Sequence, residues 1–425
     1  GRVRISAITG SLAARDLPET LIAALTKPSE KRTRRELAQL REHFDLAMPG
    51  LKALKQEMSG VEKKLAQLAP PTTEVMKELS EPRMTHVFKR GVYTNPAEPV
   101  EPGTPAILPP VKAREGNRLD LARWLVSEEN PLTARVTVNR WWAEMFGHGI
   151  VTTVEDFGIK GEPPTHPGLL DWLAMDFMEK GWSMKNLLRL IATSATFCQE
   201  STVTQDLLTR DDPNLLYARG PRFRLDAEGI RDNALAIAGL LSTGKGGPSI
   251  RPPQPDGLWK KVGGQQYKYE VSPGEQEYRR GIYVVIKRGA PYPSFVNFDA
   301  SARMACVVKR SRSNTPLQAL TLLNDPVFVG AAAAFASRVL TEKPDSNGGQ
   351  RIVHAYRLAL SRAPTDAEKR VLETLLMEQQ AAASSTGASL PAGVQPPKGV
   401  LPAEFAAWFS VASAILNLDE TITKG

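Results

Sequence analysis

Apolar side chains recur at intervals of three and four residues through most of the chain, a spacing that predicts amphipathic helices. Helix-boundary signals punctuate the pattern: Asn130 and Thr315 each stand directly before a proline, and Gly147 and Gly181 follow apolar runs. Strand-like sequence is confined to short stretches such as 281–286. The pattern predicts a mainly α fold, a multi-helix globular domain with a few short β-strands and long proline-rich loops.

Changes in composition along the chain predict four segments. They are the last strand of a truncated upstream module (1–10), a helical hairpin arm (11–69), a proline-rich extended strap (70–116) and the main helical domain (117–425). Within the main domain we expect an irregular insertion at 244–313 and a flexible loop at 383–401, because both are rich in glycine, proline or serine.

The second half of the arm has a heptad-like seam. Its apolar positions alternate in steps of three and four: Leu51, Leu54, Met58, Val61, Leu65 and Leu68. This spacing predicts an antiparallel helical hairpin that serves as a spacer or a docking arm rather than as a chemical site.

The charge balance is mildly basic. Lys and Arg number 54 against 46 Asp and Glu, a net charge of +8 in 425 residues. Such an excess favours anionic partners such as acidic glycans, but it is small for this length, and no zinc-finger spacing or RNP-like motif occurs. We therefore expect no specific nucleic-acid binding. No apolar run reaches the roughly 18 residues of a membrane span, so no transmembrane segment is predicted.

Cysteine and histidine usage excludes several chemistries. Cys198 and Cys306 form neither a CxxC nor a CxxCH motif, which excludes a thioredoxin-like site and covalent haem attachment in this chain. Both lie in apolar sequence, so buried free thiols are favoured over a disulfide. The five histidines show no HxxxH or HxH spacing, and no metal site is predicted.

A first polar cluster begins on a tryptophan-rich helix and continues into the next loop. Its members are Arg135, Asn139, Arg140, Glu155, Asp156 and His166. Two carboxylates and an imidazole in one cleft would suit acid–base catalysis, with the guanidinium groups holding an anion. The alternative, which we favour, is a buried ion-pair network. His166 also precedes Pro167, a typical helix-capping position.

Two further clusters are rich in arginine. Arg222 and Arg224 precede a helix with ion-pair spacing, which predicts stabilising pairs more than a ligand site. Residues 301–312 contain four bases and no acid, and a helix beginning near Pro316 offers free N–H groups to an anion. The candidates for binding sulfate, phosphate or carboxylate there are Arg303, Arg310, Asn314 and Asn324. The alternative is a basic loop paired with acids elsewhere.

Several stretches, in this order, resemble the planctomycete secreted-domain family known as domain of unknown function 1553. They are 130–140, 155–158, 161–167, 191–196, 224–232, 246–249 and 314–326, and the resemblance runs from about residue 75 to the end. The chain departs from the family pattern where we expect acidic residues, at Val92, Lys260, Lys261, Ala302 and Met304. Those departures argue against a carboxylate-based metal or glycosidase site.

The resemblance implies an extracytoplasmic protein, periplasmic or secreted. Full-length relatives often carry an upstream planctomycete-type cytochrome c domain, so the implied partner is that domain and the implied haem c lies outside this chain, which itself holds no cofactor. Some relatives include a jelly-roll module, and residues 1–9 resemble its last strand. The family has no established reaction, so it supplies no catalytic residues.

Three functions follow as hypotheses. The first is an uncharacterised extracytoplasmic module of a cytochrome-associated assembly that handles redox equivalents or polysaccharide. The second is a hydrolase of a polyanionic glycan, with Glu155, Asp156 and His166 as acid–base residues. The third is a structural component of the cell envelope. The hydrolase hypothesis requires that the polar clusters meet in one cleft.

Overall fold

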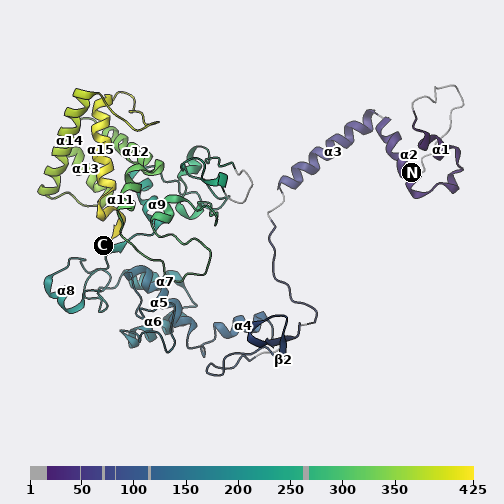
Figure 1. The fold of residues 1–425 in the computed structure, drawn as a ribbon, viewed down its shortest axis with the longest axis horizontal. Helices are drawn as coiled ribbons and strands as arrows, with labels where there is room; N and C mark the ends of the chain where they lie inside the picture. The colour runs from purple at the N-terminus through teal and green to yellow at the C-terminus, as the bar shows by residue number, and fades with distance from the viewer. Residues whose placement is uncertain (1–16, 48, 69–71, 82, 113–115, 262–267) are drawn as a thin grey trace. The chain divides into compact units, whose positions relative to one another are not determined.

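The computed structural model describes residues 17–47, 49–68, 72–81, 83–112, 116–261 and 268–425 (Figure 1). The chain divides into two compact units, Gly1–Glu101 and Pro102–Gly425, which we describe separately. Helices dominate both, and the prediction of a mainly α fold with a few short strands is confirmed. The predicted strand at 1–10 lies outside the described residues.

The first unit combines short helices with one small sheet. Its elements are α1 (Glu19–Thr26), the 3₁₀ helix η2 (Ser29–Lys31), α2 (Arg34–Ala47), α3 (Pro49–Leu68), β1 (Thr85–Phe88), the 3₁₀ turn η3 (Lys89–Gly91) and β2 (Pro96–Val100). Leu21, Ala24 and Leu40 bury a small core between α1 and α2. β1 pairs antiparallel with β2, with a register shift between His86 and Phe88.

The second unit holds the remaining elements. They are α4 (Arg118–Leu125), α5 (Thr133–Phe146), α6 (Pro167–Glu179), α7 (Met184–Ala192), α8 (Gln205–Asp211), β3 (Phe223–Arg224), α9 (Ala227–Ala238), η4 (Leu258–Lys261), η5 (Gly274–Tyr278), η6 (Gly281–Tyr283), α10 (Pro293–Asn297), α11 (Pro316–Asn324), α12 (Pro326–Glu342), α13 (Gly348–Leu360), α14 (Asp366–Thr386), α15 (Pro402–Leu416), α16 (Asp419–Ile422) and β4 (Thr423–Lys424).

The larger core of the second unit is centred on α12. This helix packs against α9 and α15, while α14 lies along α15 (Figure 1). Phe335, Phe405 and Trp408 are almost completely buried there. Capping residues determine where these helices begin: Asp325 caps α12 before Pro326, and Thr365 forms a capping box at α14. Burial of the apolar faces then fixes how they pack.

A smaller second core joins α5, α6 and α7. Val138, Leu173 and Ile191 are buried between the three helices. The rings of Trp142 and Phe146 stack on α5 at 4.3 Å between centroids. This core holds α5 rigid, and α5 supplies one wall of the cleft described below.

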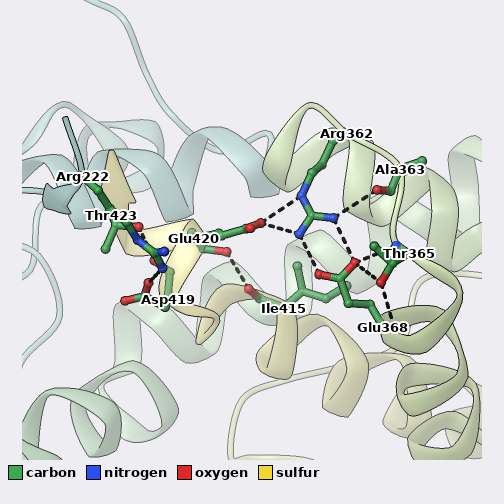
Figure 2. Close-up of polar contacts among 10 residues, drawn as sticks. Arg222, Arg362, Ala363, Thr365, Glu368, Ile415, Asp419, Glu420 and Thr423 are labelled. Carbon is green, nitrogen blue, oxygen red and sulfur yellow. Dashed lines mark hydrogen bonds and ion pairs between the residues drawn. The ribbon is translucent and has the colours of Figure 1, made fainter. Parts of the chain in front are cut away.

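The C-terminal segment ties parts of the second unit together. β4 pairs antiparallel with β3, and Lys424 Nζ donates a hydrogen bond to the carbonyl of Met145 at the end of α5 (2.8 Å). Figure 2 shows Arg362 between two carboxylates, with a donor–acceptor distance of 2.7 Å to Glu368 and to Glu420. The Arg362 hydrogen bonds lower the Glu368 pKa to about 2. The tail is thus fastened to both cores.

Several local predictions need correction. Residues 281–286 do not form a strand: they begin with η6, and Val284 makes only an isolated bridge to Ile250. The thiols of Cys198 and Cys306 are free, as expected, but exposed rather than buried: Phe197 packs against the smaller core while Cys198 beside it stays outside, and the 302–309 segment around Cys306 is exposed throughout. The helix before the predicted 383–401 loop continues to Thr386.

The apolar seam predicted on the second half of the arm is uncovered. Leu54, Met58, Val61, Leu65 and Leu68 on α3 are each more than half exposed. Within the described parts of the chain, no single helix is long and apolar enough to cross a membrane, although the bent pair α11 and α12, which meet at 58°, passes that test jointly.

Close packing of Gly281 against α9 gives a first prediction. A Cβ at Gly281 would lie 2.9 Å from the Cα of Glu228, and the Gly281 N–H donates to Asp232 (2.6 Å). We expect Gly281→Ala to lower the free energy of unfolding by about 1–3 kcal/mol through overpacking, measured by urea denaturation.

The matched control is Gly330→Ala on α12. A Cβ there meets nothing within 4 Å. Alanine in a helix interior should raise stability by about 0.5–1 kcal/mol. If Gly281→Ala were as stable as the wild type, the close approach of η6 to α9 would be disproved.

Candidate anion-binding cleft

One wall of the cleft is the C-terminal end of α5. Gly147 ends this helix in the left-handed conformation (φ 86°), and a Cβ there would lie 2.8 Å from the Phe223 ring. Only glycine satisfies both conditions without strain. Arg140 and Glu144 lie one turn apart on α5, and His148 follows Gly147. Arg140, Glu144, Gly147 and His148 line the cleft.

The opposite wall is a basic loop, residues 299–313, whose two ends are joined by hydrogen bonds. The Asp299 carboxylate accepts hydrogen bonds from the Ser313 backbone N–H (2.8 Å) and hydroxyl (2.9 Å), and from Arg224 (2.6 Å). Asp299 has a left-handed backbone conformation (φ 61°), which aspartate tolerates better than most residues. The loop therefore leaves α10 and returns to α11 at one fixed point.

Two arginines hold the upper part of this loop. Arg310 donates two hydrogen bonds to the Glu228 carboxylate on α9, at 2.6 and 3.1 Å, and this pairing raises the Arg310 pKa. Arg312 donates to the carbonyl of Gly147 (3.3 Å) and lies over the Phe223 ring at 4.3 Å. The loop is thereby attached to α9 and to the end of α5.

The cleft between these walls has a volume of about 280 Å³ and a positive charge excess. Its charged lining comprises Arg140, Lys309, Arg310 and Arg312 against Glu144 and Asp226. The walls converge from segments far apart in sequence. A neighbouring hollow of about 340 Å³ shares Lys309 and Arg310 and is also lined by Glu155.

Of the four bases, Arg310 alone has an ion-pair partner within the described chain, and Arg312 bonds only the Gly147 carbonyl. No hydrogen bond or ion pair joins Arg140 or Lys309 to another described residue, whereas Arg310 is paired with Glu228. Positive side chains that face a cleft without a carboxylate partner are suited to hold an anion.

His148 adds a neutral imidazole to the cleft. Its Nε2 lies 2.9 Å from the carbonyl oxygen of Asn214, so Nε2 carries the proton and Nδ1 keeps its lone pair. Burial lowers the His148 pKa; the Asn214 bond raises it in part, and Lys309 lowers it further. The ring stacks on Tyr217 at 5.3 Å. His148 was missed in the sequence analysis because only its position after Gly147 marked it.

The three residues predicted as acid–base groups have different surroundings. Glu155 is exposed and opens onto the neighbouring hollow. Asp156 Oδ1 accepts the Gly158 N–H (2.7 Å), which makes it a turn-forming side chain. His166 forms a hydrogen bond with the Thr165 hydroxyl (2.9 Å), and its ring packs on Tyr217 at 5.5 Å between centroids.

Of the predicted ligands on α5, one lines the cleft and two are bound to other parts of the fold. Arg140 lines the cleft. Arg135 instead pairs with Asp171 (2.6 Å) and donates to the Pro131 carbonyl. Asn139 is fully buried, and its amide bonds both the N–H and the C=O of Val151 at 2.8 and 2.9 Å. Asn139 thus fixes the loop after α5 and has no polar atom left for a ligand of the cleft.

The remaining predicted ligands are dispersed. Arg222 pairs with Asp419 at 2.5 Å, and Arg224 is held by Asp299 as described. Arg303 lines a different cavity, which also contains Glu228. Asn314 is exposed, and Asn324 donates to the Leu320 carbonyl (2.8 Å).

The start of α11 is less available to an anion than its sequence suggested. Thr315 and Gln318 form a capping box, so Thr315 takes up one of the free backbone N–H groups of the first turn. Of the twelve predicted site residues, Arg140, Arg310 and Glu155 therefore lie at the cleft or its neighbouring hollow. Across the described residues, no three His, Cys, Asp or Glu side chains form a group suited to a metal ion.

Comparison with known proteins identifies the family. A family model described as PSD1, protein of unknown function (DUF1553), matches residues 117–376, and the chain therefore belongs to this family. The matched region runs from α4 into α14 and includes both walls of the cleft. No curated protein and no solved structure matches the chain significantly.

The lowered pKa of His148 predicts a pH dependence of stability. In the unfolded chain this pKa returns to about 6.5, so the unfolded state takes up the proton first as the pH falls. The stability contribution is therefore present above pH 6.5 and is lost as the pH falls towards the folded pKa.

We expect His148→Gln, which keeps a donor for Asn214, to lose less stability than the wild type between pH 7.5 and 5. Urea unfolding at both pH values measures the difference. Equal losses in the two proteins would show that His148 does not titrate in this range.

Proposed function

We propose that this chain is an anion-binding module and that the cleft between α5 and the 299–313 loop holds a sulfate or carboxylate group of an acidic glycan. The observation that carries the proposal is that Arg140 and Lys309 face the same cleft with no ion-pair partner in the described chain, beside Arg310 and Arg312. The proposal develops the polysaccharide-handling hypothesis.

The geometry supports binding of a charged group rather than of an apolar ligand. Arg310 and Arg312 are held in place by Glu228 and Gly147, so their charges are fixed before a ligand arrives. Arg140 and Lys309 are exposed and can adjust to it. Glu144 and Asp226 limit the positive excess and would disfavour a second anionic group beside them.

The cleft volume favours one charged sugar unit at a time. At about 280 Å³, its volume lies near the lower limit for small-molecule sites. The cleft and the hollow beside Glu155 share lining residues. A polymer that enters the cleft with one anionic group can therefore continue along the 308–310 segment, which lines both spaces.

The cellular setting is proposed from the family resemblance. We place the chain outside the cytoplasm, as a module of a longer protein that carries a cytochrome c domain, with haem c in that upstream domain and none in this chain. A module that binds an acidic polymer would keep such a redox domain close to it. The envelope-structural role stays an alternative with the same binding chemistry.

Charge reversal in the cleft tests the proposal. We expect Lys309→Glu and Arg140→Glu each to weaken binding of a sulfated hexasaccharide roughly tenfold, the effect of about 1.4 kcal/mol per site. Isothermal titration calorimetry at low salt measures the affinities, and added salt should weaken wild-type binding.

The matched control is Arg370→Glu on α14. Arg370 is exposed, does not line the cleft and changes the net charge by the same amount. Its affinity should stay close to that of the wild type. Equal losses of affinity in all three variants would show that the net charge of the protein, and not the cleft, determines binding. Absence of binding by the wild type would refute the proposal.

A second measurement separates binding from hydrolysis. Glu155 lines the hollow beside the cleft, whereas His166 forms a hydrogen bond with Thr165, so the two do not form an acid–base pair. We therefore expect the sulfated hexasaccharide to keep its length after prolonged incubation with the wild type, as measured by release of reducing ends. Release of reducing ends that Glu155→Gln abolished would instead establish the hydrolase hypothesis.

A further inference from the structure

The α3 helix carries an apolar stripe that no described part of the chain covers. Leu54, Met58, Val61, Leu65 and Leu68 are spaced by four and three residues in turn, and each is more than half exposed. This is the a/d spacing of a coiled coil. The small core of the same unit buries side chains of α1 and α2 instead.

We propose that α3 pairs antiparallel with α3 of a second copy of this chain, so that the two stripes cover each other. The register of the stripe supports this pairing. In an antiparallel pair, a positions face d positions. Met58 then faces Val61 of the second copy, and Leu54 faces Leu65 of the second copy, about one common two-fold axis between residues 59 and 60.

The charged residues beside the stripe are also complementary in an antiparallel pair. Glu57 and Lys64 occupy the g positions, and Lys55 and Glu62 the e positions. An antiparallel pair brings g against g and e against e, so Glu57 meets Lys64 of the second copy and Lys55 meets Glu62 of the second copy. A parallel pair would bring Glu57 against Glu62 of the second copy, which is repulsive.

One register therefore satisfies the apolar layers and both sets of charges. The helix has 20 residues, or about 30 Å, which allows only a few core layers. We expect an association that depends on protein concentration rather than a permanent dimer. The inference does not depend on the proposed anion binding, since α3 and the cleft belong to different units.

Charge reversal at Glu57 distinguishes antiparallel from parallel pairing. Neither Glu57 nor Lys64 has a charged residue three or four positions away in its own helix, so reversing either leaves intrahelical pairs unchanged. In the full chain, Glu57→Lys converts two attractive contacts of an antiparallel dimer into repulsive ones. We expect the dimer dissociation constant to rise about tenfold.

The matched control is Glu57→Lys combined with Lys64→Glu, which should restore the wild-type dissociation constant. Sedimentation equilibrium over a range of concentrations measures all three proteins. A wild type that stays monomeric throughout would overturn the proposal. So would a tighter Glu57→Lys dimer, which indicates parallel pairing, or a double variant that stays weakened.

Disulfide trapping tests the register directly. In a background with Cys198 and Cys306 changed to serine, a mixture of Leu54→Cys and Leu65→Cys proteins should form the mixed disulfide under mild oxidation. Each protein alone should cross-link far less, because antiparallel pairing places identical copies of these positions about 16 Å apart along the helix axis. Efficient cross-linking of Leu65→Cys with itself would contradict the antiparallel register.

Discussion

The pairing of Arg310 with Glu228 is the contact on which the cleft depends. The 299–313 loop contributes four bases and almost nothing to either hydrophobic core, so apolar packing does not hold it. The two hydrogen bonds from the guanidinium to the carboxylate attach it to α9 instead. Both side chains are about one-quarter exposed, so losing one partner would leave the other charge largely buried and uncompensated. The same arginine is part of the positive lining of the cleft.

The position of the cleft follows from how the two cores of the second unit meet. α5 belongs to the smaller core and α9 to the larger one, and β3 with β4 runs between them. Gly147 permits the close approach of α5 to Phe223, and Lys424 fastens the C-terminal strand to the end of α5. A site built between two cores is sensitive to their packing, even though its charged residues lie at the surface. If α3 pairs as proposed, two such clefts would be tethered together and could bind one polymer with increased avidity.

The helices were predictable from sequence because their signals are local. Thr315 before Pro316 marked the start of α11, and Gly147 marked the end of α5, although α5 itself begins at Thr133, two positions beyond Pro131. Contacts between residues far apart in the sequence determine the other features, and the sequence pattern did not predict these. Gly281 begins a 3₁₀ turn because its N–H is bound by Asp232, which is 49 positions earlier. Asn139 looked like a ligand, but the fold uses its amide to hold Val151. His148 carried no motif, and only the folding of the basic loop against α5 placed it beside Lys309.

The central claim is that the cleft beside Lys309 and Arg140 holds an anion, and the most direct test is anomalous diffraction from crystals soaked in selenate, an analogue of sulfate. The account predicts a selenium peak within hydrogen-bonding distance of Lys309, and no such peak in crystals of the Lys309→Glu variant. Peaks confined to other surfaces, with the cleft occupied by water alone, would contradict it.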